Sequence, residues 1–181
     1  ITAFAKARDT LLAQNKDASI DTTDVVNNAI NKLQSKGFIA TSPEGGIKLT
    51  RIGQKADKAN ELLGDILSYQ GQIGIDDAQQ LKTYILDDII NYKPQVGQQL
   101  NQATRDLQSV ARELRKGVNE KLNSTLGSEY TAINKKLSNV LDIFDNSEIK
   151  DITNAQNIDT IASKLKRTGT TRTETAKKLT D

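Results

Sequence analysis

The chain contains no cysteine, histidine, tryptophan or methionine in its 181 residues. The absence of cysteine excludes disulfide bonds and thiolate metal sites. The absence of histidine removes the commonest metal ligand and the usual general base of enzymes. We therefore expect a non-enzymatic protein without a cofactor or metal. Because methionine is absent, we also expect the sequence to be a piece of a longer polypeptide.

Large apolar side chains are also scarce. Hydrophobic residues make up 36% of the sequence and aromatic residues 4%, with three Phe and four Tyr. Burial of apolar surface is the main source of folding stability, and aromatic rings bury the most surface per residue. This composition favours slender helices that pack on one another or on partner chains. No apolar run reaches the roughly 18 residues of a membrane span, so we expect no membrane span.

The N-terminal part of the sequence predicts helices and one β-hairpin. After a first helix and a polar loop, apolar residues recur at helical spacing up to Gly37, which suits the left-handed residue that ends a helix. Segments 38–41 and 47–50 then alternate in polarity on either side of the turn sequence SPEGG, where proline and glycine favour a tight turn. These patterns predict a small β-hairpin near residues 38–50.

Most of the remaining sequence predicts helices. The apolar pattern indicates helices over about 76–91, 98–125 and 128–145, with Gly127 at the turn between the last two. Apolar residues then become sparse, which favours a weakly helical, partly extended tail. The predicted fold is mostly α, an elongated antiparallel helical bundle with one small β-hairpin. Its predicted parts are a helical region with the hairpin (1–70), the antiparallel bundle (75–145) and the tail (146–181).

A narrow apolar stripe runs along the predicted helix 98–125 in steps of three and four residues. A stripe of this width is typical of a coiled-coil seam, whereas a helix on a globular core has a broader apolar face. We expect the stripe to meet the apolar side of the helix 128–145 across the turn at Gly127. The residues predicted to pack in this helix seam are Leu107, Val110, Leu114, Val118, Leu122, Ile133, Leu137, Leu141 and Phe144.

Residues 25–59 contain the run INKLQSKGFIATSPEGGIKLT followed by RIGQKA. This segment resembles the recognition helix, wing and following helix of MarR-type winged-helix regulators, which implies a helix in the DNA major groove. Its charges disfavour DNA binding, because Asp21 and Asp24 begin the helix and Glu44 lies in the wing turn, where phosphates would approach. The side chains that would contact nucleic acid are Lys32, Lys36 and Lys48, with Lys164, Lys166 and Arg167 in the basic tail.

Two pairs of adjacent carboxylates are the remaining candidates for chemistry, Asp76 with Asp77 and Asp87 with Asp88. Adjacent residues on a helix point about 100° apart, so neither pair can flank a bond as the two acids of a glycosidase do. Asp76 and Asp77 are better explained by a helix start, where acidic side chains oppose the helix dipole. No catalytic residue is predicted.

A further pattern spans roughly residues 55–144, in the order LKTYILDDIINY, ARELRKGVNEKL and EYTAINKKLSNVLDIF. It resembles helical virion-associated proteins of tailed bacteriophages, in which an Asp-Asp helix ending in Tyr precedes a Leu-Arg helix and a Tyr-x-x-x-Asn helix. The matching residues are Leu81, Lys82, Asp87, Asp88 and Tyr92 in the first element, Leu114, Arg115 and Asn119 in the second, and Tyr130 and Asn134 in the third.

This resemblance implies a structural protein of the virion or an internal protein that is ejected with the genome. Such a protein would pack through its helices against other virion subunits or copies of itself. Its location would be the virion, and the host cytoplasm during assembly. The alternatives are a winged-helix DNA-binding protein and a generic coiled-coil adaptor, and contact with nucleic acid is not favoured.

Overall fold

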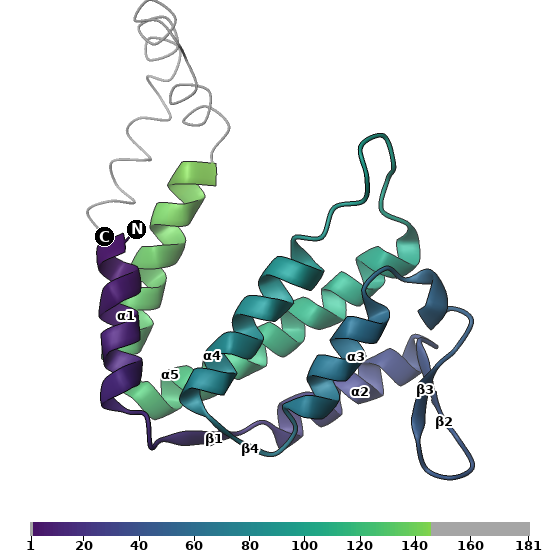
Figure 1. Ribbon diagram of the computed structural model, residues 1–181, viewed down its shortest axis with the longest axis horizontal. Coiled ribbons are helices and arrows are strands. Elements are labelled where there is room, and N and C mark those ends of the chain that lie inside the picture. The colour runs from purple at the N-terminus through teal and green to yellow at the C-terminus, as the bar shows by residue number, and fades with distance from the viewer. Residues whose placement is uncertain (1, 146–181) are drawn as a thin grey trace, which may run out of the picture. The chain divides into compact units, whose positions relative to one another are not determined.

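The computed structural model describes residues 2–145, and they are mostly α-helical (Figure 1). The helical fold and the hairpin near residue 40 confirm the predicted fold class. The α-helices are α1 (Thr2–Gln14), α2 (Thr23–Ser35), α3 (Ala59–Ser68), α4 (Ile75–Tyr84) and α5 (Gln102–Asp145). The strands are β1 (Ser19–Asp21), β2 (Ile39–Thr41), β3 (Ile47–Leu49) and β4 (Gln72–Gly74). A 3₁₀ turn, η1 (Gly53–Lys55), and a π-helix, η2 (Ile85–Ile90), complete the described elements.

The described part of the chain divides into two compact units. Residues 12–127 form one unit, and residues 2–11 group with residues 128–145 in the other. Strand β4 occupies the expected gap between residues 70 and 75 and pairs there with β1. The predicted tail, with Lys164, Lys166 and Arg167, lies outside the described residues.

The β-hairpin follows α2 as the turn chemistry predicts. Strands β2 and β3 pair antiparallel, with Ile39 opposite Leu49, and the backbone N–H of Ser42 donates to the carbonyl of Gly46 across the turn. Phe38, directly before β2, is 2% exposed. A Cβ on Gly53 would lie 2.1 Å from the carbonyl oxygen of Phe38, so the backbone of η1 approaches the hairpin closely only because residue 53 is glycine.

A second strand pair, which we did not predict, joins the two ends of a 50-residue stretch. Strand β1 pairs antiparallel with β4, with Ile20 opposite Ile73. The buried hydroxyl of Thr22 donates to the carbonyl oxygens of Tyr69 and Gly71, so it does not cap α2. The pair closes α2, the hairpin and α3 into one loop of chain and brings the start of α2 beside the start of α4.

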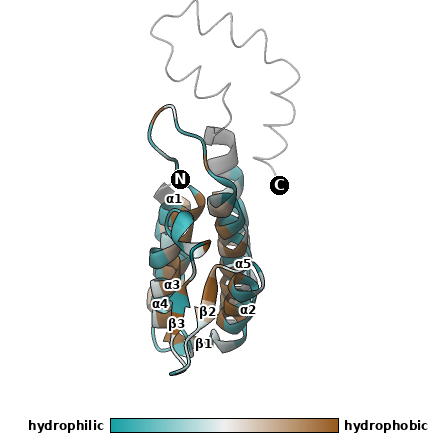
Figure 2. Cartoon of the chain, turned by 90° about the vertical axis from the view of Figure 1, so that its right-hand side faces the viewer, coloured by the Kyte–Doolittle hydropathy of each residue, from teal (hydrophilic) through white to brown (hydrophobic). Residues whose placement is uncertain are grey.

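The helices of the 12–127 unit are amphipathic, with hydrophobic and hydrophilic residues alternating along each of them (Figure 2). The core between them is made of aliphatic side chains and one phenylalanine, because the chain has few rings. Its most deeply buried members include Val26 and Leu33 of α2, Leu62 and Ile66 of α3, and Ala78 and Leu81 of α4.

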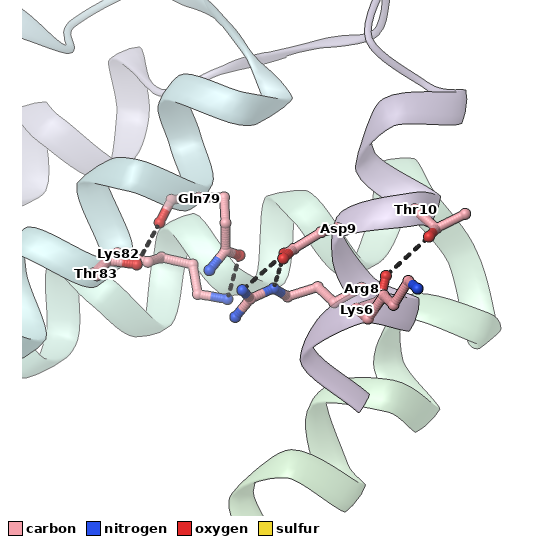
Figure 3. Close-up of polar contacts among 7 residues, drawn as sticks. All are labelled: Lys6, Arg8, Asp9, Thr10, Gln79, Lys82 and Thr83. Atoms are coloured by element: carbon pink, nitrogen blue, oxygen red, sulfur yellow. Dashed lines mark hydrogen bonds and ion pairs between the residues drawn. The ribbon is translucent and has the colours of Figure 1, made fainter. Parts of the chain in front are cut away.

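The other unit contains most of α1 and the last part of α5. On α1, the guanidinium of Arg8 donates to the carboxylate of Asp9 at 2.8 Å, and the hydroxyl of Thr10 donates to the carbonyl of Lys6 (Figure 3). Both contacts are local to α1 and lie at its solvent-exposed side. They satisfy polar groups of the helix without fixing it to another element.

We predict that Phe38→Ala lowers the free energy of unfolding by about 3 kcal/mol, because it removes a buried ring and leaves a cavity. Ile52→Ala is the control, since Ile52 is 51% exposed and its truncation should change stability by less than about 0.5 kcal/mol. Urea unfolding followed by circular dichroism measures both. Equal effects of the two substitutions would show that the Phe38 ring is not part of the core.

Candidate functional site: the packing surface of α5

The first arm of α5, residues 102–126, contains the first five residues of the predicted helix seam. Its stripe members Leu107, Val110, Leu114, Val118 and Leu122 are all buried, each at most 2% exposed. In the 12–127 unit, the first arm lies against α2 on one side and against α4 and η2 on another (Figure 1). The stripe therefore faces neighbouring helices of its own unit.

Contact with α2 is close and is fixed at both ends by charge. The ammonium of Lys121 lies 2.9 Å from the carboxylate of Asp24, and Lys32 forms an ion pair with Glu113. Because position 24 pairs with 121 and position 32 with 113, the two helices run antiparallel. Hydrogen bonding to Lys121 lowers the pKa of the Asp24 carboxyl. The four side chains are partly exposed, so the pairs set register more than they add stability.

Between these ion pairs, a glycine lets the two helices meet. A Cβ on Gly117 would lie 2.5 Å from Cγ1 of Val25, a distance that packed carbon atoms do not reach. The backbone of α5 thus touches a side chain of α2 directly. A groove of about 370 Å³ runs along this contact, with Asn28, Lys116 and Glu120 among the residues at its walls. Its charged groups are of both signs, so it does not select an anion or a cation.

Contact with α4 is made by a buried lysine. Lys82 is 5% exposed, and its ammonium donates to the side-chain oxygen of Asn119 at 2.6 Å. It also donates to the side-chain oxygen of Gln79 at 3.4 Å (Figure 3). Further along, the side-chain amide of Gln108 donates to the carbonyl of Ile89 at 3.1 Å, and it also reaches the carbonyl of Tyr92. Gln108 thereby satisfies carbonyl groups at the end of η2 that the helix leaves without partners.

The start of α5 is tied to the loop before α3. Asn101 accepts a hydrogen bond from the backbone N–H of Thr104, as an N-cap residue does, and its side-chain amide donates to the carbonyl of Lys55. The buried hydroxyl of Thr104 accepts from the backbone N–H of Asp57 at 2.9 Å. Both ends of the first arm are therefore held by side chains to segments distant in sequence.

The second arm, residues 128–145, is a helix separate from the first arm, as the sequence predicts. Gly127 between them has a non-helical backbone, with φ 77° and ψ −164°. The two arms belong to different compact units, so neither unit by itself contains the predicted seam. Leu137 is buried and Ile133 is partly exposed. Leu141 and Phe144 lie among residues whose side chains are not described.

The lysines with which a winged-helix domain would contact DNA differ in their surroundings. Lys32 is paired with Glu113 of α5, whereas Lys36, after α2, and Lys48, on β3, are exposed. Residues on the α5 side of α2 line the groove with α5, which leaves Asn27 and Asn31 on its exposed surface. Asn27 accepts a hydrogen bond from Gln70. Asn27 and Asn31 thus give the side of α2 away from the groove a polar character.

Negative charge gathers where α3 approaches η2. Burial raises the pKa of the Asp65 carboxyl, and the carboxylates of Asp88 and Glu61 raise it further. Lys58, which precedes α3 in a left-handed conformation, pairs with Glu61 at 3.2 Å and lies 5.7 Å from the centre of the Tyr92 ring. Within the described residues, no group of three or more acidic side chains is arranged to hold a metal ion.

Comparisons with protein-family models, with curated proteins and with solved structures each return no match. In the described part of the chain, no helix combines the length and the apolar character that crossing a membrane requires.

We predict that Gly117→Ala destabilises the protein by about 1–3 kcal/mol, because the added methyl group collides with Val25. Gly64→Ala is the matched control. Gly64 also lies inside a helix, but a Cβ there meets no atom within 4 Å, so alanine should stabilise α3 by up to about 1 kcal/mol. Adding Val25→Ala to Gly117→Ala should recover part of the loss. Denaturant unfolding of the parent and the three variants measures these effects. Equal effects of the two glycine substitutions would contradict the close contact.

We predict opposite effects of pH for two substitutions. The pKa of Asp65 is raised in the folded state, so its ionisation opposes folding, and its contribution to stability falls as pH rises from about 4 through the folded pKa. Asp65→Asn should therefore stabilise the protein more at pH 7 than at pH 3. The pKa of Asp24 is lowered, so Asp24→Asn should destabilise it at pH 7 and have less effect at pH 3. Thermal melting at both pH values tests the signs.

Proposed function

We propose that this chain is a non-enzymatic structural or internal protein of a phage particle, and that it acts by packing its helices against other virion subunits. The observation that carries the proposal is the place of the residues shared with virion-associated helical proteins. Lys82 of the first matching element donates to Asn119 of the second. Leu81 and Leu114, from the same two elements, are buried. Four residues of the pattern thus lie where α4 contacts α5, whereas Asp87 and Asp88 of the same pattern are exposed.

Lys82, Leu81, Leu114 and Asn119 support a shared architecture, because they stabilise the packing of one helix on another. The proposal that the chain binds other subunits is supported by an exposed loop between η2 and α5. This loop projects from the helices (Figure 1), and Val96 at its turn is fully exposed. The turn is closed by a hydrogen bond from the N–H of Gln98 to the carbonyl of Gln95. Burial of Val96 in a neighbouring subunit would stabilise the contact.

Duplex binding by α2 and the hairpin is the second candidate, favoured by the exposure of Lys36 and Lys48. Two positive charges give weak attraction to phosphate, since each neutralised phosphate contributes separately to affinity. Asp24 and Lys32, at the ends of the groove side of α2, are paired with α5. The arrangement offers more support to protein packing than to DNA recognition.

We predict that the chain copurifies with intact, nuclease-treated particles through a density gradient, and that mass spectrometry identifies it there. Leu114→Asp places a charge in the buried stripe of α5, which costs several kcal/mol, so this variant should be lost from particles. Arg112→Asp is the control. Arg112 is exposed on the same helix, and the substitution should leave incorporation unchanged.

Two outcomes would contradict the proposal. One is recovery of the parent chain from infected cells only in the fraction free of particles. The other is that the parent binds duplex DNA, and that the double variant Lys36→Glu, Lys48→Glu binds it with lower affinity and a weaker dependence on salt. This result would favour the winged-helix function.

A further inference from the structure

Val96 differs from the other exposed apolar side chains of the described residues. It lies in the loop between η2 and α5, residues 91–101, and its exposure is 106%. The next most exposed large apolar side chain in the described part is Ile52, at 51%. An aliphatic side chain stabilises a fold through the surface that it removes from water. Val96 removes none, so packing within its own molecule does not explain it.

The tip of the loop is a formed turn. The backbone N–H of Gln98 donates to the carbonyl of Gln95 at 2.9 Å, which closes a β-turn with Val96 and Gly97 at its centre. Gly97 has a positive φ of 89°, and Val96 does not have a positive φ. A positive φ at the third residue alone is the mark of a type II turn, which favours glycine there. The turn therefore fixes the backbone that carries Val96.

Both ends of the loop are held by side chains of α5. The buried side chain of Gln108 donates to the carbonyl of Tyr92 at 3.3 Å, where the loop leaves η2. At the other end, the guanidinium of Arg105 donates to the carbonyl of Leu100 at 2.8 Å. The ring of Pro94 restricts one more backbone angle between these contacts. Few backbone angles of the loop remain free, so binding through it loses little conformational entropy.

The scarcity of charge indicates what kind of surface the loop fits. Lys93 is the one charged residue in 91–101, whereas 27% of the whole chain is charged, and five residues of the loop are Asn or Gln. The centres of protein–protein interfaces are depleted of charge. One cation gives little affinity for nucleic acid, where each neutralised phosphate contributes separately. The groove between α2 and α5 of a second copy is a poor match, because its walls are charged.

We propose that residues 91–101 are a docking loop, and that Val96 enters a small apolar pocket on a different protein subunit of the particle. This inference rests on the proposed function, because it specifies the surface through which the chain meets a neighbouring subunit. The amide side chains around Val96 meet the polar rim of that pocket. Gly97, Arg105 and Gln108 are positioning residues, since they shape the loop without touching the partner.

Competition for incorporation tests the contact. A variant is coexpressed with the parent during infection, and mass spectrometry compares their ratio in purified particles with their ratio in the lysate. Val96→Asp should lower this relative incorporation at least about tenfold, because it places a charge in an apolar pocket. Val96→Thr keeps the shape and adds a hydroxyl, so we expect a loss of about fivefold or more. Ile52→Asp is the control, and its incorporation should equal that of the parent.

A second pair of variants tests the shape of the loop. Gly97→Ala strains the turn, so the free loop leaves this conformation and docking must restore it, which should lower relative incorporation roughly 5- to 30-fold. Gly45→Ala is the matched control. Gly45 also has a positive φ, 84°, in an exposed turn, and a Cβ on either glycine meets no atom within 4 Å. Thermal melting should show similar small effects of both substitutions, while Gly45→Ala leaves incorporation unchanged.

A photoreactive amino acid at position 96 identifies the partner inside the particle. We expect it to crosslink to a different virion protein. The same amino acid at position 44, in the exposed turn of the hairpin, should not form this crosslink. A crosslink between two copies of the chain at position 96 would overturn the assignment of the pocket to a different subunit.

The outcomes separate this inference from the proposed function. Absence of the parent from particles overturns both. With the parent present, the docking loop alone is overturned if Val96→Asp or Val96→Thr competes as well as the parent, or if Ile52→Asp is lost as strongly as Val96→Asp. Equal losses of Gly97→Ala and Gly45→Ala would show that the shape of the loop is not what the partner requires.

Discussion

The close approach of α2 and α5 is the constraint on which the rest of the 12–127 unit depends. A chain with 4% aromatic residues cannot fill a wide space between helices, so its helices must lie near one another for their small side chains to touch. Gly117 makes this possible, since any larger residue would collide with Val25. Ala29 and Ala111 are also buried, and small residues at helix contacts allow short distances between axes. The thin core is thus compensated by close packing.

Polar side chains then set the register of the first arm of α5. Asn101 and Thr104 bind the loop before α3, Gln108 binds the end of η2, and Asn119 binds Lys82 of α4. Each such hydrogen bond contributes only about 1 kcal/mol on balance, but leaving its buried partner unsatisfied costs more. A helix shifted by one turn would lose several of them together. The uniform aliphatic stripe does not distinguish between such positions, and the polar contacts do.

The hairpin and most helices could be predicted from the sequence, because their signals are local: the SPEGG turn, the glycine after α2 and the helical spacing of apolar residues. The pairing of β1 with β4 could not, since its strands have three residues each and lie far apart in the chain. Gly127 was predicted to separate two helices, and its non-helical backbone does interrupt α5 at that residue. The role of Gly117 was not predicted, because it depends on the side chain of Val25 that packs against this glycine. Its position within the apolar stripe was the available signal.

Pairing between distant parts of the chain also determines when the 12–127 unit can form. Strand β1 and helix α2 leave the ribosome before their partners, because β4 follows β1 after a 50-residue stretch and the first arm of α5 is the last segment of the unit to be made. Closing such long loops has an entropic cost before any contact compensates for it. During synthesis, the side of α2 that packs on α5 therefore stays exposed to water until α5 has been made. The nascent chain consequently passes through a stage in which association with another copy competes with its own folding.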